Sequence, residues 1–285
     1  MAEPTFEVIG HTRCEERPHT GCVIIALGKL RERWVGILEK TLPEPMSSLA
    51  AGILLGVKGQ MPQDFYQQLV STGTLHIVAA SGYNVSVVAS VLMGVVGGVV
   101  SRGVASGIGV AGIILYVVIA GGSASVVRAG VMGSLTLIAY YFGRPSEARR
   151  LLWVTGAIML LTNPLLILDI GFQLSFAATA GLLYLEPRMQ VLKSQILKFS
   201  NEGVWKAVET YLFPTLAATL ATLPIILYHF GRVSWISPIV NTLVLPVVPL
   251  IMGVSAGVLV GGQVMAWLAY VPLAYVVWVI RWFGS

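Results

Sequence analysis

The feature that most constrains this chain is a series of apolar runs that recur from Val85 to the C-terminus. Each run has roughly the 17 to 25 residues that an α-helix needs to cross the hydrocarbon of a bilayer. The sequence therefore predicts an all-α polytopic membrane protein with about eight transmembrane helices. Their expected cores are 85–100, 104–120, 126–142, 151–168, 171–185, 212–229, 236–260 and 264–280.

The composition agrees with this fold class and excludes a water-soluble globule. Of the 285 residues, 56% are hydrophobic and only 11% are charged, which leaves too little polar surface for a soluble protein of this size. The net charge of +5 is compatible with nucleic-acid binding, but Lys and Arg that flank bilayer spans are ordinary topology signals. Charge alone therefore identifies no partner. The first forty residues lack an apolar core behind a basic start, so targeting is expected from the membrane helices.

A polar segment, residues 1–27, carries both cysteines of the chain in two similar tetrads, His11-Thr-Arg-Cys14 and His19-Thr-Gly-Cys22. A zinc site with two histidines and two cysteines is chemically reasonable, although the spacing matches no standard finger. A disulfide between Cys14 and Cys22 fits if the segment faces outward. Two inert thiols in a poorly ordered terminus are the third interpretation.

Three further segments are apolar or amphipathic but are not predicted to span. The stretch Gly28–Leu42 gathers leucine, isoleucine and tryptophan on one helical stripe, and we expect it to lie along the membrane surface. The alternative is a helix packed on a soluble domain. The run LAAGILLG at 49–56 is too short to cross and is expected to be re-entrant or interfacial. The amphipathic segment Arg188–Glu209 should also lie in the interface.

The basic residues predict the orientation. With eight spans, the loops at 101–103, 143–150, 186–211 and 261–263 share one side, whereas the opposite loops hold little besides Arg232. The positive-inside rule makes the rich side cytoplasmic and places both termini outside, although the basic residues before position 60 do not follow it. The basic residues on the rich side are Arg102, Arg144, Arg149, Arg150, Arg188, Lys193, Lys198 and Lys206.

Several polar residues lie inside or beside the apolar runs, where each costs several kcal/mol unless it finds a partner or a wet cavity. In GTLHIVAASGYNVS, residues 73–86, Ser81 and Asn84 are three positions apart and can meet on a helix. Such groups suit a short, interrupted helix that lines an aqueous cavity. The full set is His76, Ser81, Asn84, Arg128, Asp169, Gln173, His229 and Asn241.

Each of these residues also has a purely structural interpretation. His76 and Ser81 diverge by about 140° on a helix, and the chain lacks a GxSxG elbow, which argues against an intramembrane hydrolase. Arg128 either snorkels to the interface or lies in a pore wall that faces phosphate. Asp169 is expected to cap the helix that follows it. Prolines near Asn241 predict kinks that either surround a pathway or represent ordinary bending of membrane helices.

Four stretches together resemble the membrane domain of the ComEC family of competence proteins. The likeness runs in the same order from about Leu30 to about Gly262. The stretches are GTLHIVAASGYNVSVV, Arg128-Ala129, NPLLILDIGFQLSFAATAGLLYL from Asn163, and LAATLATLPIILYHFGRVSWISPIVNTLVLPVVPL from Leu216.

The resemblance implies a channel domain, residues 28–285, through which single-stranded DNA crosses the bacterial cytoplasmic membrane during natural transformation. It implies no cofactor and no reaction catalysed by this chain. His76, Ser81, Gly82 and Asn84 fall in the HxxAxSGxN-type signature of the family, and Arg128 matches its arginine. The pathway residues expected are His76, Ser81, Gly82, Tyr83, Asn84, Arg128, Gln173 and Asn241.

Full-length members of this family usually carry an oligonucleotide-binding-like (OB-like) domain before the membrane region and a metallo-β-lactamase-like nuclease after it. Residues 1–27 are too few for the first and are expected to be its tail, and no HxHxDH motif occurs before Ser285. The expected partners are single-stranded DNA, the lipid bilayer, separate OB-like and nuclease modules, and a cytoplasmic motor that pulls DNA. A secondary transporter of a small anionic or lipid-linked solute is the alternative function.

Overall fold

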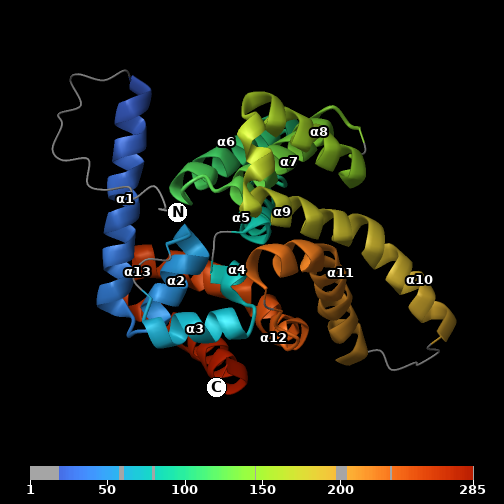
Figure 1. Cartoon of the computed structure of the whole chain (residues 1–285). Coiled ribbons are helices and arrows are strands. Elements are labelled where there is room, and N and C mark those ends of the chain that lie inside the picture. The colour runs from blue at the N-terminus through green and yellow to red at the C-terminus, as the bar shows by residue number, and fades with distance from the viewer. Residues whose placement is uncertain are drawn as a thin grey trace.

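The computed structural model describes residues 19–57, 61–78, 81–144, 146–196, 204–231 and 233–284, with the backbone alone at 19–26, 192–196 and 204–209. Every regular element in these ranges is helical, as the sequence predicts (Figure 1). The first elements are α1 (His19–Thr41), α2 (Met46–Leu55), α3 (Gln63–Ser71) and α4 (Leu75–Val78). They are followed by α5 (Gly82–Val96), α6 (Arg102–Ile119), α7 (Ala124–Tyr141) and α8 (Ala148–Thr162).

The second half alternates long helices with short irregular turns. A 3₁₀ turn η2 (Pro164–Leu168), α9 (Ile170–Ala180), a π-helical turn η3 (Gly181–Leu185) and α10 (Glu186–Ile196) come first. The last elements are α11 (Val204–Phe230), α12 (Ser237–Val244), a 3₁₀ turn η4 (Leu245–Val247) and α13 (Val248–Gly284).

Four helical segments in the described residues are long and apolar enough to cross a membrane, so the predicted count of eight is not confirmed. Two apolar helices, α2 and α5, are shorter than the roughly 20 residues that a bilayer requires. The four segments are Arg102–Ile119, Ala124–Tyr141, Thr210–Phe230 and Ser237–Gly284.

The difference in count has two sources, turns that interrupt predicted spans and two predicted cores that share one continuous segment. The span expected at 151–168 stops at Thr162, because the Asn163 side chain accepts the backbone N–H of Leu165 and Pro164 starts a 3₁₀ turn. The span expected at 171–185 changes to a π-helical turn at Gly181. The cores expected at 236–260 and 264–280 both fall in the single segment Ser237–Gly284, and the kink of α13 at Gly262, with φ 54°, lies between them.

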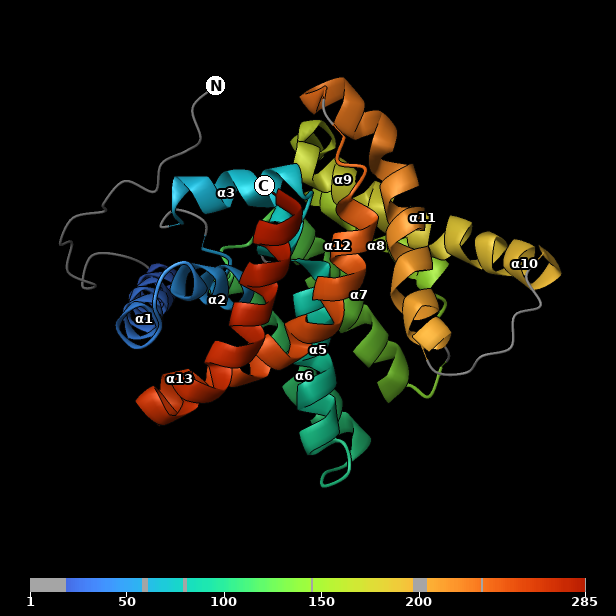
Figure 2. The same cartoon turned by 90° about the horizontal axis from the view of Figure 1, so that it is seen from below.

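Helices α1, α2, α3 and α13 pack together on one flank of the molecule (Figures 1 and 2). The side chains of Leu38, Ile53, Phe65 and Ile280 lie fully buried among them. The predicted amphipathic stripe of α1 thus packs on α2 and α13, and α2 forms a short buried helix. Whether α1 also touches a membrane surface stays a prediction.

The second group contains α5, α6 and α7, which pack against one another, with α8 and α9 against α7. Helix α11 packs on α9, η3 and α12. Both views show α10 projecting away from the rest of the molecule (Figures 1 and 2). The described residues of the predicted interfacial segment Arg188–Glu209 lie on two helices, most of α10 and the start of α11.

Candidate functional site

Arg128 lies on the second turn of α7 and is buried within the bundle, with 8% of its surface exposed. Its Nε donates a hydrogen bond to Ser175 Oγ on α9 at 2.7 Å, and Ser175 donates in turn to Ser125 Oγ at 3.0 Å. The guanidinium carbon lies 5.9 Å from the centre of the Phe176 ring. The side chain thus points between helices, which favours a place inside the bundle over the snorkelling interpretation.

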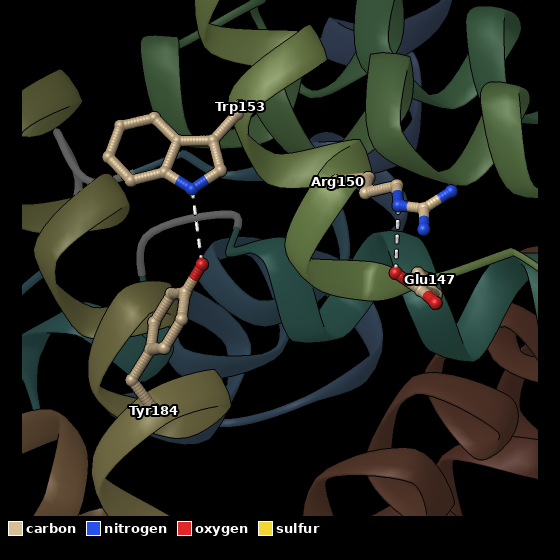
Figure 3. Close-up of polar contacts among 4 residues, drawn as sticks. All are labelled: Glu147, Arg150, Trp153 and Tyr184. Carbon is tan, nitrogen blue, oxygen red and sulfur yellow. Dashed lines mark hydrogen bonds and ion pairs between the residues drawn. The ribbon is translucent and has the colours of Figure 1, made fainter.

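No carboxylate neutralises this arginine among the residues that the structure describes. The one ion pair in those ranges joins Arg150 to Glu147 at 2.9 Å, and both side chains are exposed (Figure 3). The terminal Nη atoms of Arg128 likewise make no hydrogen bond to a described residue. A buried charge without a counter-ion is costly, so this position favours an anion that approaches from outside the chain.

Gly82, the first residue of α5, lies directly against the guanidinium. A Cβ built on Gly82 would stand 2.9 Å from Arg128 Nη2 and 3.3 Å from Ala129 Cβ. A larger residue at this position would therefore displace the guanidinium from the start of α5. The structure thus brings together two sequence features that were predicted separately, the SGxN signature and the later arginine. The helix N-terminus adds a partial positive charge at the same place.

Asn84 holds the signature to the rest of the fold. Its side chain is fully buried, and its Nδ2 donates to the Ile53 carbonyl of α2 at 2.8 Å. Its Oδ1 accepts from Ser81 Oγ at 3.2 Å, so these two residues meet as predicted. The Tyr116 hydroxyl lies near the Asn84 amide but forms no hydrogen bond with it or with another described residue. Asn84 faces packed protein in this conformation, whereas Tyr83, next to it in sequence, is 38% exposed.

The helix that carries the signature is interrupted, as the sequence predicts. Helix α4 ends at Val78 and α5 begins at Gly82. Ser81 stands at the N-cap of α5 with extended backbone angles, but its hydroxyl bonds to Asn84 rather than capping a backbone N–H. The break therefore positions the signature beside Arg128 without using Ser81 as a helix cap.

His76 and Asn241 belong to a second polar region, around the turn between α3 and α4. The imidazole Nδ1 of His76 lies 2.9 Å from the Gly73 carbonyl, and the ring is exposed. Gly73 adopts φ +70° and packs against Ser237, which accepts a hydrogen bond from Asn241 Nδ2 at 3.1 Å. Asn241 is buried, and its Oδ1 has no partner among described residues. Neither residue contacts Arg128 in the described contacts.

Gln173 has a local structural role instead of joining either cluster. Its Nε2 donates to the Ile167 carbonyl at 2.8 Å and closes the turn between η2 and α9. Asp169 Oδ1 accepts the Phe172 N–H at 2.6 Å, which confirms the predicted helix cap. The sequence therefore identified the function of Asp169 correctly, while Gln173 remains untested as a pathway residue.

Ser175 and Ser125 are site residues that the sequence did not single out as partners of Arg128. Ser125 lies on the same helix as Arg128, three residues before it, whereas Ser175 lies 47 residues away on α9, so no spacing rule connects Ser175 to the arginine. The available signal was a small polar residue inside the apolar segment 171–176. Such residues often hydrogen-bond across membrane helices, which is what Ser175 does.

The described residues contain no group of three or more His, Cys, Asp or Glu that could hold a metal ion. Cys14 and His11 lie outside the described residues, and the side chains of His19 and Cys22 are not described. The zinc, disulfide and free-thiol interpretations of the N-terminal tetrads therefore stay open.

Comparisons with known proteins agree with the resemblance seen in the motifs. A family model described as "Competence protein" matches residues 53–285. The ComE operon protein 3 of Bacillus subtilis (strain 168) is 26% identical over 233 residues, which cover 81% of this chain and 28% of that protein. The chain thus spans little more than a quarter of the length of this relative. No solved structure matches the chain.

Proposed function

Because the chain belongs to the ComEC family of competence proteins, we propose that it forms a conduit for single-stranded DNA. The strand would cross the cytoplasmic membrane during natural transformation. In this proposal the chain catalyses no reaction and needs no cofactor. The driving force comes from a cytoplasmic motor, and separate OB-like and nuclease modules deliver and process the DNA.

The observation that carries the proposal is the buried, unpaired charge of Arg128 against Gly82 at the start of α5. A phosphate is the anion that recurs along a DNA strand, and a guanidinium recognises its oxygens through charge-assisted hydrogen bonds. One such contact attracts the backbone, whereas many would hold it, since each phosphate contact adds to a salt-dependent affinity. A single arginine therefore suits passage better than tight binding.

The neighbouring residues fit transient contact with a strand. Tyr83 presents a partly exposed ring on which a base can stack, and the Ser81 hydroxyl is half-buried beside it. Asn84 is buried and bonded to Ile53, so its role in the proposal is to hold the signature in place. The pathway proposal consequently rests on Arg128, Gly82, Tyr83 and Ser81 more than on Asn84.

The test compares Arg128→Gln and Arg128→Lys in a deletion strain that is defective in DNA uptake. Gln keeps a donor for Ser175 but loses the charge. We expect transformation to fall at least about tenfold, because that factor corresponds to the free energy of one hydrogen bond to a charged group. Lys keeps the charge and should retain more activity. DNA bound at the cell surface should be unchanged in every strain.

A stability control separates this role from a structural one. Removing an unpaired buried charge should leave the thermal midpoint of Arg128→Gln unchanged or raised. Normal transformation in the Gln variant, or in the deletion strain, would contradict the conduit. A fall in transformation that follows a lowered midpoint would make Arg128 a structural residue.

A secondary transporter of a small anion is the second candidate, and interrupted helices favour it. Helix α4 stops before α5, and α12 continues into α13 through a 3₁₀ turn at Pro246. Transporters use such breaks to bind solutes in mid-membrane. Proteoliposomes loaded with small organic anions distinguish the two, because the conduit predicts no Arg128-dependent flux of these solutes.

A further inference from the structure

A cluster of exposed aromatic and basic side chains lies where α8 begins and does not take part in the site around Arg128. The Trp153 indole N–H donates to the Tyr184 hydroxyl at 3.1 Å, which ties α8 to the π-helical turn η3 (Figure 3). The Arg149 guanidinium carbon lies 5.4 Å from the centre of the same Tyr184 ring. The ring therefore holds the guanidinium through a cation–π contact and leaves its N–H donors available.

The two arginines at this point differ in their partners. Arg150 forms an ion pair with Glu147 (Figure 3). Arg149 has no carboxylate partner among the described residues. The pairing with Glu147 neutralises Arg150 locally. Arg149 thus remains the positively charged donor of the cluster, and it is exposed on the surface.

The outer face of α8 shows what surrounds this donor. Trp153, Val154, Ile158 and Leu161 are exposed on one side of the helix, and the buried residues Leu152, Thr155, Gly156 and Met159 occupy the other. In a membrane protein an exposed apolar stripe on a helix is typical of a surface that faces lipid. Trp153 ends this stripe, and Arg149 lies one turn beyond it. An apolar stripe followed by a tryptophan and then an arginine is typical of a helix end that passes from the hydrocarbon core into the headgroup region.

Neighbouring helix ends continue the same pattern. Arg102, at the start of α6, lies 5.8 Å from the Tyr140 ring near the end of α7. Tyr141 and Phe142 follow, both more than half exposed. The short connection from α7 to α8 places these groups on the same side of the bundle as Arg149. They form the belt of aromatic and basic residues expected at a membrane interface.

We propose that Arg149, oriented by Tyr184 and flanked by Trp153, binds the phosphate of an anionic phospholipid headgroup and anchors the short helix α8 at the interface. Helix α8 has 15 residues, about 22 Å, and is shorter than the hydrocarbon core. A lipid phosphate drawn to its first turn would offset this mismatch. The apolar stripe favours lipid over DNA as the occupant. The inference does not depend on the conduit.

The experiment counts lipids bound to the detergent-solubilised full chain by native mass spectrometry, with phosphatidylglycerol or phosphatidylcholine as probe. We expect the protein to retain phosphatidylglycerol selectively. Arg149→Gln should lower this retention about fivefold, which is the contribution of one arginine to binding at an anionic lipid surface. Arg150→Gln is the matched control and should have a much smaller effect because Glu147 already pairs with Arg150. Equal losses in the two variants would overturn the site in favour of unspecific attraction.

Further arms identify the source of the phosphate and the role of the ring. Tyr184→Leu keeps Arg149 but removes the aromatic ring that its guanidinium contacts, and it should reduce lipid retention as much as Arg149→Gln does. Full lipid retention in this variant would overturn the site. Inorganic phosphate at millimolar concentration should not displace the lipid, and displacement would assign a site for soluble anions instead. An oligonucleotide whose binding requires Arg149, with no lipid selectivity, would assign the cluster to DNA and overturn the proposal.

Discussion

At the residue scale, the candidate site depends on how one arginine is accommodated. Serine hydroxyls on α9 and α7 and the Phe176 ring replace part of the water that Arg128 loses on burial. None of these groups carries a negative charge, so the guanidinium retains its attraction for an anion. Gly82 supplies the space that the side chain occupies.

Substitution of Gly82 tests this contact directly. The methyl group of Gly82→Ala would stand 2.9 Å from Arg128 Nη2 and displace it, since the end of an arginine side chain is flexible. We expect transformation to fall about tenfold, the effect of losing one charge-assisted hydrogen bond, with little change in the amount of folded protein. Gly94→Ala is the control on the same helix, because a Cβ there meets nothing within 4 Å. If both variants transform alike, the contact is unimportant.

Asn84 should matter through stability. Asn84→Leu leaves the Ile53 carbonyl and the Ser81 hydroxyl without their partner, at a cost of about 1 to 3 kcal/mol of unfolding free energy. Denaturant titration of the purified protein measures this loss. Ser86→Ala, on the exposed side of α5, removes only a bond to the Gly82 carbonyl and should be nearly silent. An Asn84→Leu protein of unchanged stability would argue that the amide serves a pathway instead.

At the element scale, small polar side chains decide where the apolar helices stop. The side chains of Asn163 and Asp169 accept backbone N–H groups, so the span expected at 151–168 ends in a 3₁₀ turn and the helix of the next expected span starts at Ile170. Asp169→Ala should therefore lower the unfolding free energy by about 0.5 to 2 kcal/mol, whereas Asp169→Asn keeps an acceptor oxygen and should lose little. Thermal unfolding of the two variants compares them, and equal midpoints would show that the cap contributes nothing.

At the scale of the whole molecule, the open question is which side of the membrane each helix end occupies. The charge distribution predicts that the loop after α7 is cytoplasmic and the loop before it is outside. In a background with Cys14 and Cys22 replaced by alanine, Ser146→Cys should react with an impermeant thiol reagent in inverted vesicles. Ser123→Cys should react in intact spheroplasts. The reverse labelling pattern would invert the topology and contradict outward termini.

Part of this architecture follows from the sequence because it depends on local composition. Apolar runs specify membrane helices, and the serine and glycine at 81–82 predict the break before α5. The cap at Asp169 depends on atoms three residues apart, so it could be predicted as well. The number of full-length spans could not, because a turn of a few residues inside an apolar run changes hydropathy very little.

By itself the sequence determined the helical membrane class, the family and the residues that carry its signature. The tertiary structure decided which of them meet. It placed Arg128 against Gly82 and Ser175, kept His76 and Asn241 in a separate region, and closed Asn84 onto α2. The physical reason is that a hydrogen bond or a van der Waals contact between helices depends on how their axes pack, and neither periodicity nor composition encodes that distance.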